Sequence, residues 1–209
     1  MSADITSPPR HAVILCHPEK GSFNASVAEA YCSAVSALGH ETCVRDLYAM
    51  NFQPALRASE QPGAMFHPHP DVEEEIRLLH GADVFVLVYP IWFGLPPAML
   101  KGYVERVFGR GVMPRDLQER SARGVLAGKR LVSFTSSGTS AVWLDEQGQI
   151  QSLRTIFDRY LEHAFGMAPS EHFHFGHIVE GLNTRFVEQD LTDVRDYARA
   201  IARKAEQAA

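Results

Sequence analysis

Two uninterrupted runs of apolar residues constrain this chain most strongly. Residues 12–16 (AVILC) and 84–89 (VFVLVY) contain no charged or amide side chain. A strand buried on one face alternates polar and apolar residues, whereas a strand covered on both faces does not. Both runs are also too short for a buried helix of ordinary length. They therefore predict central strands of a parallel sheet with helices on both faces.

Further segments continue the alternation of strands and helices. We expect three more strands at 41–47, 129–134 and 171–177, and helices at 24–38, 98–108 and 152–165, from Asp71 onward and from Thr192 onward. Right-handed crossovers then place helices on both faces of the sheet. The fold class is therefore α/β, a doubly wound five-stranded parallel sheet. The order 2-1-3-4-5 is the natural one for five strands, and its topological switch point lies between strands one and three.

Length and charge exclude several classes of protein. The chain has 209 residues, which suits one domain over residues 1–209. Its formal net charge of -5 disfavours nucleic acid as a partner. No apolar run reaches the roughly 20 residues of a membrane helix, and the N-terminal residues lack the features of a signal peptide. We expect a cytoplasmic protein without a membrane partner, with its three cysteines reduced and buried.

The two loops that follow strands one and three meet at the expected switch point. The first loop, HPEKGSFNAS, presents hydroxyl, amide and backbone donors at the start of a helix, where the helix dipole favours an anion. A phosphate group fits this loop. The alternative is that Ser22 and Asn24 only cap the helix.

The second loop, PIWFGLPP, places two aromatic rings on a turn whose backbone is restricted by prolines. Gly94 permits close approach to the main chain. Such a loop suits a planar heterocycle, although Trp92 and Phe93 could instead cover the following helix. A third loop, TSSGTSA at 135–141, could bond the polar edge of a ring system.

These segments resemble the flavodoxin-like NAD(P)H dehydrogenase (quinone) family, which includes the DT-diaphorase and modulator of drug activity B types. The resemblance rests on HPEKGSFNAS, on YPIWFGLPPAMLKGYVERVF, on TSSG and on FGMAPSEHFHFG. It covers most of the chain and implies a single flavodoxin-like, flavin-binding domain over residues 1–209. It also implies a homodimer, in which the excursion around 109–123 could line the partner's pocket.

The resemblance further implies which residues bind the flavin. The phosphate end would lie against His17, Ser22, Phe23, Asn24 and Ala25, and the ring along Pro90, Ile91, Trp92, Phe93 and Gly94; Thr135, Ser136, Ser137 and Gly138 would face the pyrimidine edge. The motif SFN favours FAD, with FMN as the alternative. The expected reaction passes a hydride from NAD(P)H through the flavin to a quinone or similar flat acceptor by a ping-pong route.

The sequence departs from the family where a tyrosine and a histidine usually assist the chemistry. Trp143 stands near the tyrosine position and is the candidate catalytic residue, while the following segment DEQGQIQSL has no histidine. The second possibility is therefore a flavin-binding regulatory or electron-relay subunit without efficient quinone turnover.

Other classes of site lack their motifs. The chain has no G-x-S-x-G, no P-loop and no G-x-G-x-x-G, which argues against a serine hydrolase, a nucleotide hydrolase and a separate Rossmann domain. Histidines gather at 67–69 and at 172–177, and alternation puts His172 and His174 on one face. Their spacing does not match a closed metal site, so we expect no metal.

Overall fold

The computed structural model describes residues 7–63 and 65–207. Residues 1–6, where we expected no signal peptide, lie outside this part of the chain. Five parallel strands form one sheet in the order β2-β1-β3-β4-β5, which confirms the predicted fold class. The strands are β1 (Arg10–Leu15), β2 (Glu41–Asp46), β3 (Val84–Pro90), β4 (Arg130–Ser136) and β5 (Glu171–Phe175).

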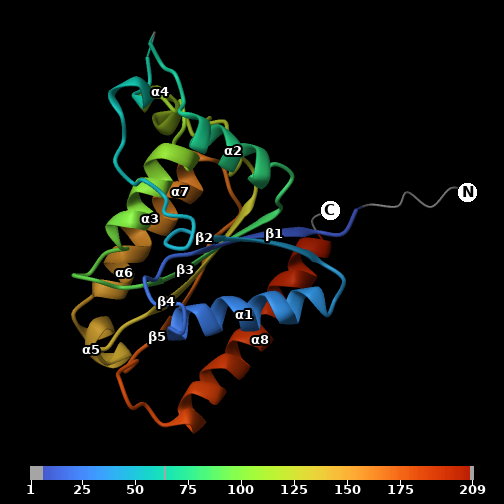
Figure 1. Cartoon of the computed structure of the whole chain (residues 1–209), viewed down its shortest axis with the longest axis vertical. Coiled ribbons are helices and arrows are strands. Elements are labelled where there is room, and N and C mark those ends of the chain that lie inside the picture. Colours follow the sequence, from blue (N-terminus) through green and yellow to red (C-terminus); the bar gives the residue numbers. More distant parts are fainter. Residues whose placement is uncertain (1–6, 64, 208–209) are drawn as a thin grey trace, which may run out of the picture.

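Helices cover both faces of the sheet, as Figure 1 shows. One face carries α1 (Phe23–Ser36) and α8 (Thr184–Glu206), which pack against each other. The other face carries α2 (Pro70–Leu79), α3 (Ala98–Tyr103), α6 (Gln149–Leu153) and α7 (Arg159–Ala164). Two π-helical segments continue these helices, η2 (Val104–Phe108) after α3 and η3 (Arg154–Asp158) between α6 and α7. Shorter elements are the 3-10 turn η1 (Ala58–Glu60), α4 (Pro114–Gln118) and α5 (Ala141–Glu146).

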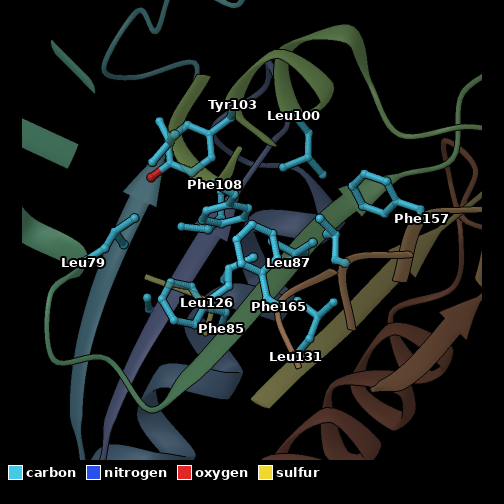
Figure 2. Packing of buried hydrophobic residues seen from close by; sticks show 14 of the residues in the cluster. Leu79, Phe85, Leu87, Leu100, Tyr103, Phe108, Leu126, Leu131, Phe157 and Phe165 are labelled. Carbon is cyan, nitrogen blue, oxygen red and sulfur yellow. The ribbon is translucent and has the colours of Figure 1, made fainter. Parts of the chain in front are cut away.

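Alternating side chains of the central strands supply two hydrophobic clusters. All seven residues of β3 are buried, as its uninterrupted apolar run requires. Phe85 and Leu87 face α2, α3 and α7, where they pack with Tyr103 and Phe108 (Figure 2). Val84, Val86 and Val88 face α1 and α8. The sheet is therefore the middle layer of a three-layer sandwich.

Several predicted boundaries are wrong. The last helix begins at Thr184, not at Thr192, because Asn183 caps it by accepting a hydrogen bond from the backbone of Arg185. Strand β4 extends to Ser136, so Thr135 and Ser136 belong to the sheet and not to a loop. The helix expected at 152–165 begins at Gln149 and includes η3. Helix α5 lies in a segment that was predicted to be a loop at its start and has no strong sequence signal.

The excursion at 51–70 is anchored to η2 by a buried cation. The guanidinium of Arg106 is completely buried and donates to Glu60 at 2.7 and 2.8 Å and to Asp71 at 2.9 and 3.0 Å. Nearby, a Cβ added to Gly102 would lie 2.2 Å from the carbonyl oxygen of Pro54. Gly102 thus lets the segment 51–70, which has little regular structure, pack directly against α3.

Candidate functional site

The carboxyl ends of β1 and β3 lie side by side in the sheet. Helix α1, which follows β1, packs on one face, and α3, which follows β3, packs on the other. This divergence makes the position between them the topological switch point, where ligands bind in doubly wound sheets. Strands β4 and β5 run parallel to β3, so the loops that follow them begin at the same edge of the sheet (Figure 1).

The loop after β1 ends in a helix start that leaves two backbone donors free. Ser22 caps α1, since its Oγ accepts a hydrogen bond of 3.2 Å from the amide of Ala25. Phe23 and Asn24 are the first two helical residues, so their N–H groups have no acceptor within the helix. Ser22 therefore does act as a cap, and two amides at the positive end of a 14-residue helix are left for an anion.

Two of the predicted phosphate-site residues use their side chains inside the protein. The amide nitrogen of Asn24 donates to the hydroxyl of Ser136 at 2.9 Å, which ties the start of α1 to the end of β4. The ring of Phe23 packs edge-on against Phe175 with centroids 5.5 Å apart. These contacts fix the position of the helix start, while Ala25 is half-buried beside it.

The loop after β3 forms a tight turn that holds two aromatic rings at the surface. The backbones of Trp92 and Leu95 exchange hydrogen bonds of 3.0 and 3.1 Å, and Phe93 and Gly94 between them have φ of 50° and 78°. Positive φ at both central positions defines a type I′ geometry, which costs a non-glycine residue free energy. The side chain of Phe93 is fully exposed and that of Trp92 is 41% exposed.

The two loops meet. The rings of His17 and Trp92 have centroids 6.0 Å apart. Pro90 is buried at the end of β3, and the amide of Ile91 donates to the carbonyl of Ser136 at 2.7 Å. A helix start with two free backbone amides and an exposed aromatic turn therefore share one edge of the sheet.

The TSSG segment is divided between the sheet and the loop. Thr135 is buried, and its hydroxyl lies 2.9 Å from both Nε2 of His172 and Nδ1 of His174. Ser137 and Gly138 begin the loop at the edge of the sheet, with the Ser137 hydroxyl 2.9 Å from the carbonyl of Thr139. Only the second half of TSSG thus lies where it could face a ligand.

Trp143 lies in α5, and its side chain is 47% exposed. Its backbone amide donates to Oγ of Ser140, which caps the helix, at 3.4 Å. Helix α5 thus starts just after the TSSG loop, and the ring of Trp143 is partly in solvent. Its catalytic role stays a prediction.

A groove that the sequence did not predict lies at this edge. It has a volume of about 660 Å³ and runs between the loop after β1 and the loop after β5. His17, Ser22 and Ser26 line one side, and residues 178–182 line the other. In the sequence, the only indication that residues 178–182 form a loop beside a ligand is the glycine at position 181, shortly after the fifth strand.

The remaining candidate side chains are engaged elsewhere. Within residues 7–63 and 65–207, no three metal-binding side chains form a group that could hold an ion. His69 pairs instead with Asp71 at 2.8 Å. Cys16 is buried, and burial raises the pKa of its thiol to about 12, so it is not a reactive thiolate at neutral pH.

Comparison with known proteins defines the family. Residues 9–203 match the family model for the flavodoxin-like fold. The chain belongs to this flavodoxin-like family. An uncharacterized NAD(P)H oxidoreductase of Haemophilus influenzae is 32% identical over 170 residues, which cover 80% of this chain and 84% of that protein.

Two further proteins show the range of similarity. NAD(P)H dehydrogenase [quinone] 1 of Cavia porcellus is 36% identical over 121 residues, which cover 49% of this chain but only 44% of that protein's length. The structure of an NAD(P)H:quinone oxidoreductase from Methanothermobacter marburgensis has a TM-score of 0.80 at 26% identity, with 93% of this chain and 96% of that chain covered. Across the described residues, no helix has the length and apolar character to cross a membrane.

Proposed function

We propose that this chain is an NAD(P)H-dependent flavoprotein oxidoreductase that delivers electrons to a quinone or similar flat acceptor. One observation carries the proposal: the start of α1 and the aromatic turn at 92–95 meet at the switch point, with His17 and Trp92 in ring contact. The names of the relatives, NAD(P)H oxidoreductase and NAD(P)H dehydrogenase [quinone], support the same activity.

The residues present fit a flavin. Free amides of Phe23 and Asn24 at a helix N-terminus suit its phosphate, and a partly exposed indole beside a type I′ turn suits its planar ring. The bound flavin would supply the hydride and electron chemistry, while the protein supplies position and hydrogen bonds. We assign phosphate contacts to residues 17 and 22–25 and ring contacts to 90–94. Pyrimidine-edge contacts are limited to Ser137 and Gly138, because the side chains of Thr135 and Ser136 are packed inside the protein.

FAD suits the site better than FMN. The groove of about 660 Å³ continues past His17 and Ser22 toward residues 178–182, so it offers room beyond a single phosphate. A volume of this size is typical of pockets for small ligands and cofactors. FMN would occupy only the side of this groove lined by His17 and Ser22.

We propose a ping-pong order for the two substrates. Phe93 is fully exposed, so the aromatic turn is open to solvent and nicotinamide and acceptor can each reach the ring there in turn. Each would stack there, and the protein would hold the ring fixed between the two half-reactions. The single domain over residues 1–209 and the cytoplasmic location stay predictions.

The flavin content and its turnover test this proposal together. We expect the purified protein to be yellow and to release FAD on heating, with the cofactor identified by mass. Anaerobic addition of NADH or NADPH should bleach the flavin rapidly, and a quinone should restore its colour. Initial rates over both substrates should give parallel double-reciprocal lines. A colourless protein that takes up neither FAD nor FMN would refute the proposal, and slow bleaching with tight partner binding would favour the electron-relay alternative.

We also propose a homodimer, because apolar side chains remain uncovered around α3, α4 and α7. Leu56, Leu117 and Tyr160 line one continuous hollow there, and Ile156 is exposed one turn before Tyr160. Covering such a patch is typical of an interface. Its position next to the excursion at 109–123 agrees with a partner that completes the pocket.

Sedimentation tests the dimer. We expect a mass twice the 23.2 kDa of one chain. Tyr160→Glu should yield monomers, because it places a charge in the proposed interface. Leu38→Glu, at an exposed position beyond the end of α1, is the matched control and should remain dimeric. A monomeric wild type, or a dimer unaffected by Tyr160→Glu, would contradict this assignment.

A further inference from the structure

A continuous chain of hydrogen-bonding side chains runs from the interior to the TSSG loop. It begins at Asp158 in η3, whose Oδ2 lies 2.5 Å from Nδ1 of His172 in β5. Nε2 of His172 lies 2.9 Å from the hydroxyl of Thr135, and that hydroxyl lies 2.9 Å from Nδ1 of His174. Nε2 of His174 lies 3.1 Å from the hydroxyl of Ser137. Four contacts thus link a buried carboxylate to the edge of the sheet.

The two ends of this hydrogen-bond network, Asp158 and Ser137, differ in their surroundings. Asp158 and His172 have side chains only 1% exposed, and the other carboxylate oxygen of Asp158 accepts a hydrogen bond of 2.8 Å from Ser133. Ser137, at the opposite end, is the first residue after β4 and is 8% exposed. A buried ionisable pair therefore communicates with a hydroxyl next to the surface.

With neutral imidazoles, the hydrogen bonds have one consistent direction. His172 donates from Nδ1 to Asp158, so its Nε2 accepts from the hydroxyl of Thr135. The oxygen of Thr135 then accepts from Nδ1 of His174. Nε2 of His174 in turn accepts from the hydroxyl of Ser137, so every donor and acceptor along the chain is paired.

Addition of one proton reverses the direction of every hydrogen bond except the one from His172 to Asp158. If His172 is an imidazolium, its Nε2 donates to Thr135, and the hydroxyl of Thr135 donates to Nδ1 of His174. His174 is then protonated on Nε2 and donates to Ser137. The hydroxyl of Ser137 turns to the carbonyl of Thr139, which lies 2.9 Å away. This second arrangement is also fully paired, and it differs from the first by a single proton.

We propose that Ser137, His174, Thr135 and His172 form a proton relay that ends at Asp158. A proton that enters at Ser137 passes to His174, while His174 gives its other proton to Thr135 and Thr135 gives its own to His172. One proton enters and one is stored on the Asp158–His172 pair, so the balance is exact in both directions without any other reactant.

Charge and burial agree with this assignment. Burial, together with the neighbouring His172, lowers the pKa of His174 to about 4, so His174 stays neutral and changes only the position of its proton. Tyr89 of β3 also faces Asp158, and burial followed by the charge of Asp158 raises its pKa well above 10. Tyr89 therefore does not compete for the transferred proton. Thr135 is 1% exposed, which leaves no room for it to act as a nucleophile on a substrate.

The role of the relay rests on the proposed function. TSSG is the segment assigned to the pyrimidine edge of the flavin, and the sequence lacks the tyrosine and histidine that usually assist there. The relay ends in that segment, so Ser137 can exchange a proton with the edge of the bound ring or with water there. Thr135, His172 and His174 would act as positioning and proton-storing residues.

Nitrogen-15 NMR of the histidine rings tests the relay directly. Spectra of the purified full chain, recorded over a series of pH values, follow the charge of His172 and the tautomer of His174 together. At the midpoint where His172 becomes charged, His174 should move its proton from Nδ1 to Nε2 without gaining charge. A His174 ring that keeps one tautomer, or that becomes charged at this midpoint, would overturn the proposal with the wild type alone.

Variants of Thr135 provide the matched comparison. Thr135→Val keeps the shape but removes the hydroxyl, so the tautomer of His174 should no longer follow the charge of His172. Thr135→Ser restores a hydroxyl and should restore the linked change. If the link survives in Thr135→Val, the relay does not pass through Thr135 and the proposal fails.

Activity provides a separate measurement. In the flavin-loaded enzyme, Thr135→Val should lower the turnover number at least about tenfold with unchanged flavin affinity, and Thr135→Ser should recover most of it. A protein that binds no flavin would refute the proposed function but leave the NMR result standing. Flavin turnover without the linked tautomer change would refute the relay alone.

Discussion

Replacement of Ser22 by aspartate is expected to weaken flavin binding at least about 100-fold without disturbing α1. Aspartate caps a helix as well as serine does, so the N-terminus of α1 should remain ordered. The new carboxylate, however, would lie where we place the flavin phosphate. Two like charges about 4 Å apart repel by about 4 kcal/mol at the effective dielectric constant of a protein surface, and a 100-fold loss needs about 2.8 kcal/mol.

Ser22→Asn is the matched control, because asparagine has the shape and capping ability of aspartate without its charge. We expect this variant to bind flavin within about threefold of the wild type. Fluorescence titration of the protein with FAD measures both affinities, and circular dichroism checks that α1 is retained. If Ser22→Asp binds FAD as tightly as Ser22→Asn, the phosphate does not lie at the start of α1.

Replacement of Arg106 by leucine is expected to destabilise the protein by about 3–5 kcal/mol. The guanidinium is completely buried between Glu60 and Asp71, and Glu60 is itself only 5% exposed. Removal of one partner leaves a buried carboxylate without its counter-charge, which is the costly way to break such a network. Urea unfolding followed by circular dichroism gives the change in free energy of unfolding.

Arg77→Leu is the comparison, because Arg77 pairs with Glu74 at an exposed position of α2. We expect it to change stability by less than about 1 kcal/mol. If both variants lose the same stability, the buried network is not what anchors the excursion at 51–70.

Acid provides a second check on this network. Hydrogen bonds from Arg106 lower the pKa of Glu60, and for Asp71 the effect of burial is outweighed by bonds from Arg106 and His69, so that its pKa falls to about 2. Lowered carboxyl pKa values stabilise the fold above the unfolded values near 4, and this contribution is lost as the pH falls toward 2. The wild type should therefore lose stability over this range more steeply than Arg106→Leu.

The sequence was sufficient to predict the sheet because its decisive signals are local. The apolar runs at 12–16 and 84–89 require strands covered on both faces, and the alternation of strands and helices then leaves few topologies. Helix boundaries were harder. Asn183 and Thr192 both have capping side chains, and only the structure shows that Asn183 is the one that caps α8, by accepting from the backbone of Arg185.

The candidate site was predicted in position but not in detail. Strand order brings the loops after β1 and β3 together, which the ring contact of His17 with Trp92 confirms. No spacing rule reveals that Asn24 bonds Ser136, or that Thr135 turns inward toward β5. Such contacts depend on partners 37 to 112 positions away, and their geometry follows from the completed sheet.

The hydrogen bond from Asn24 to Ser136 bears on how the protein is made. The two residues are 112 positions apart, so the segment that steadies the start of α1 leaves the ribosome long after α1 itself. A nascent chain that ends before β4 lacks this hydrogen bond. It also lacks the carbonyl of Ser136, which accepts a hydrogen bond from the amide of Ile91. Cofactor capture should therefore be a late step of biosynthesis, and truncated chains should emerge without colour.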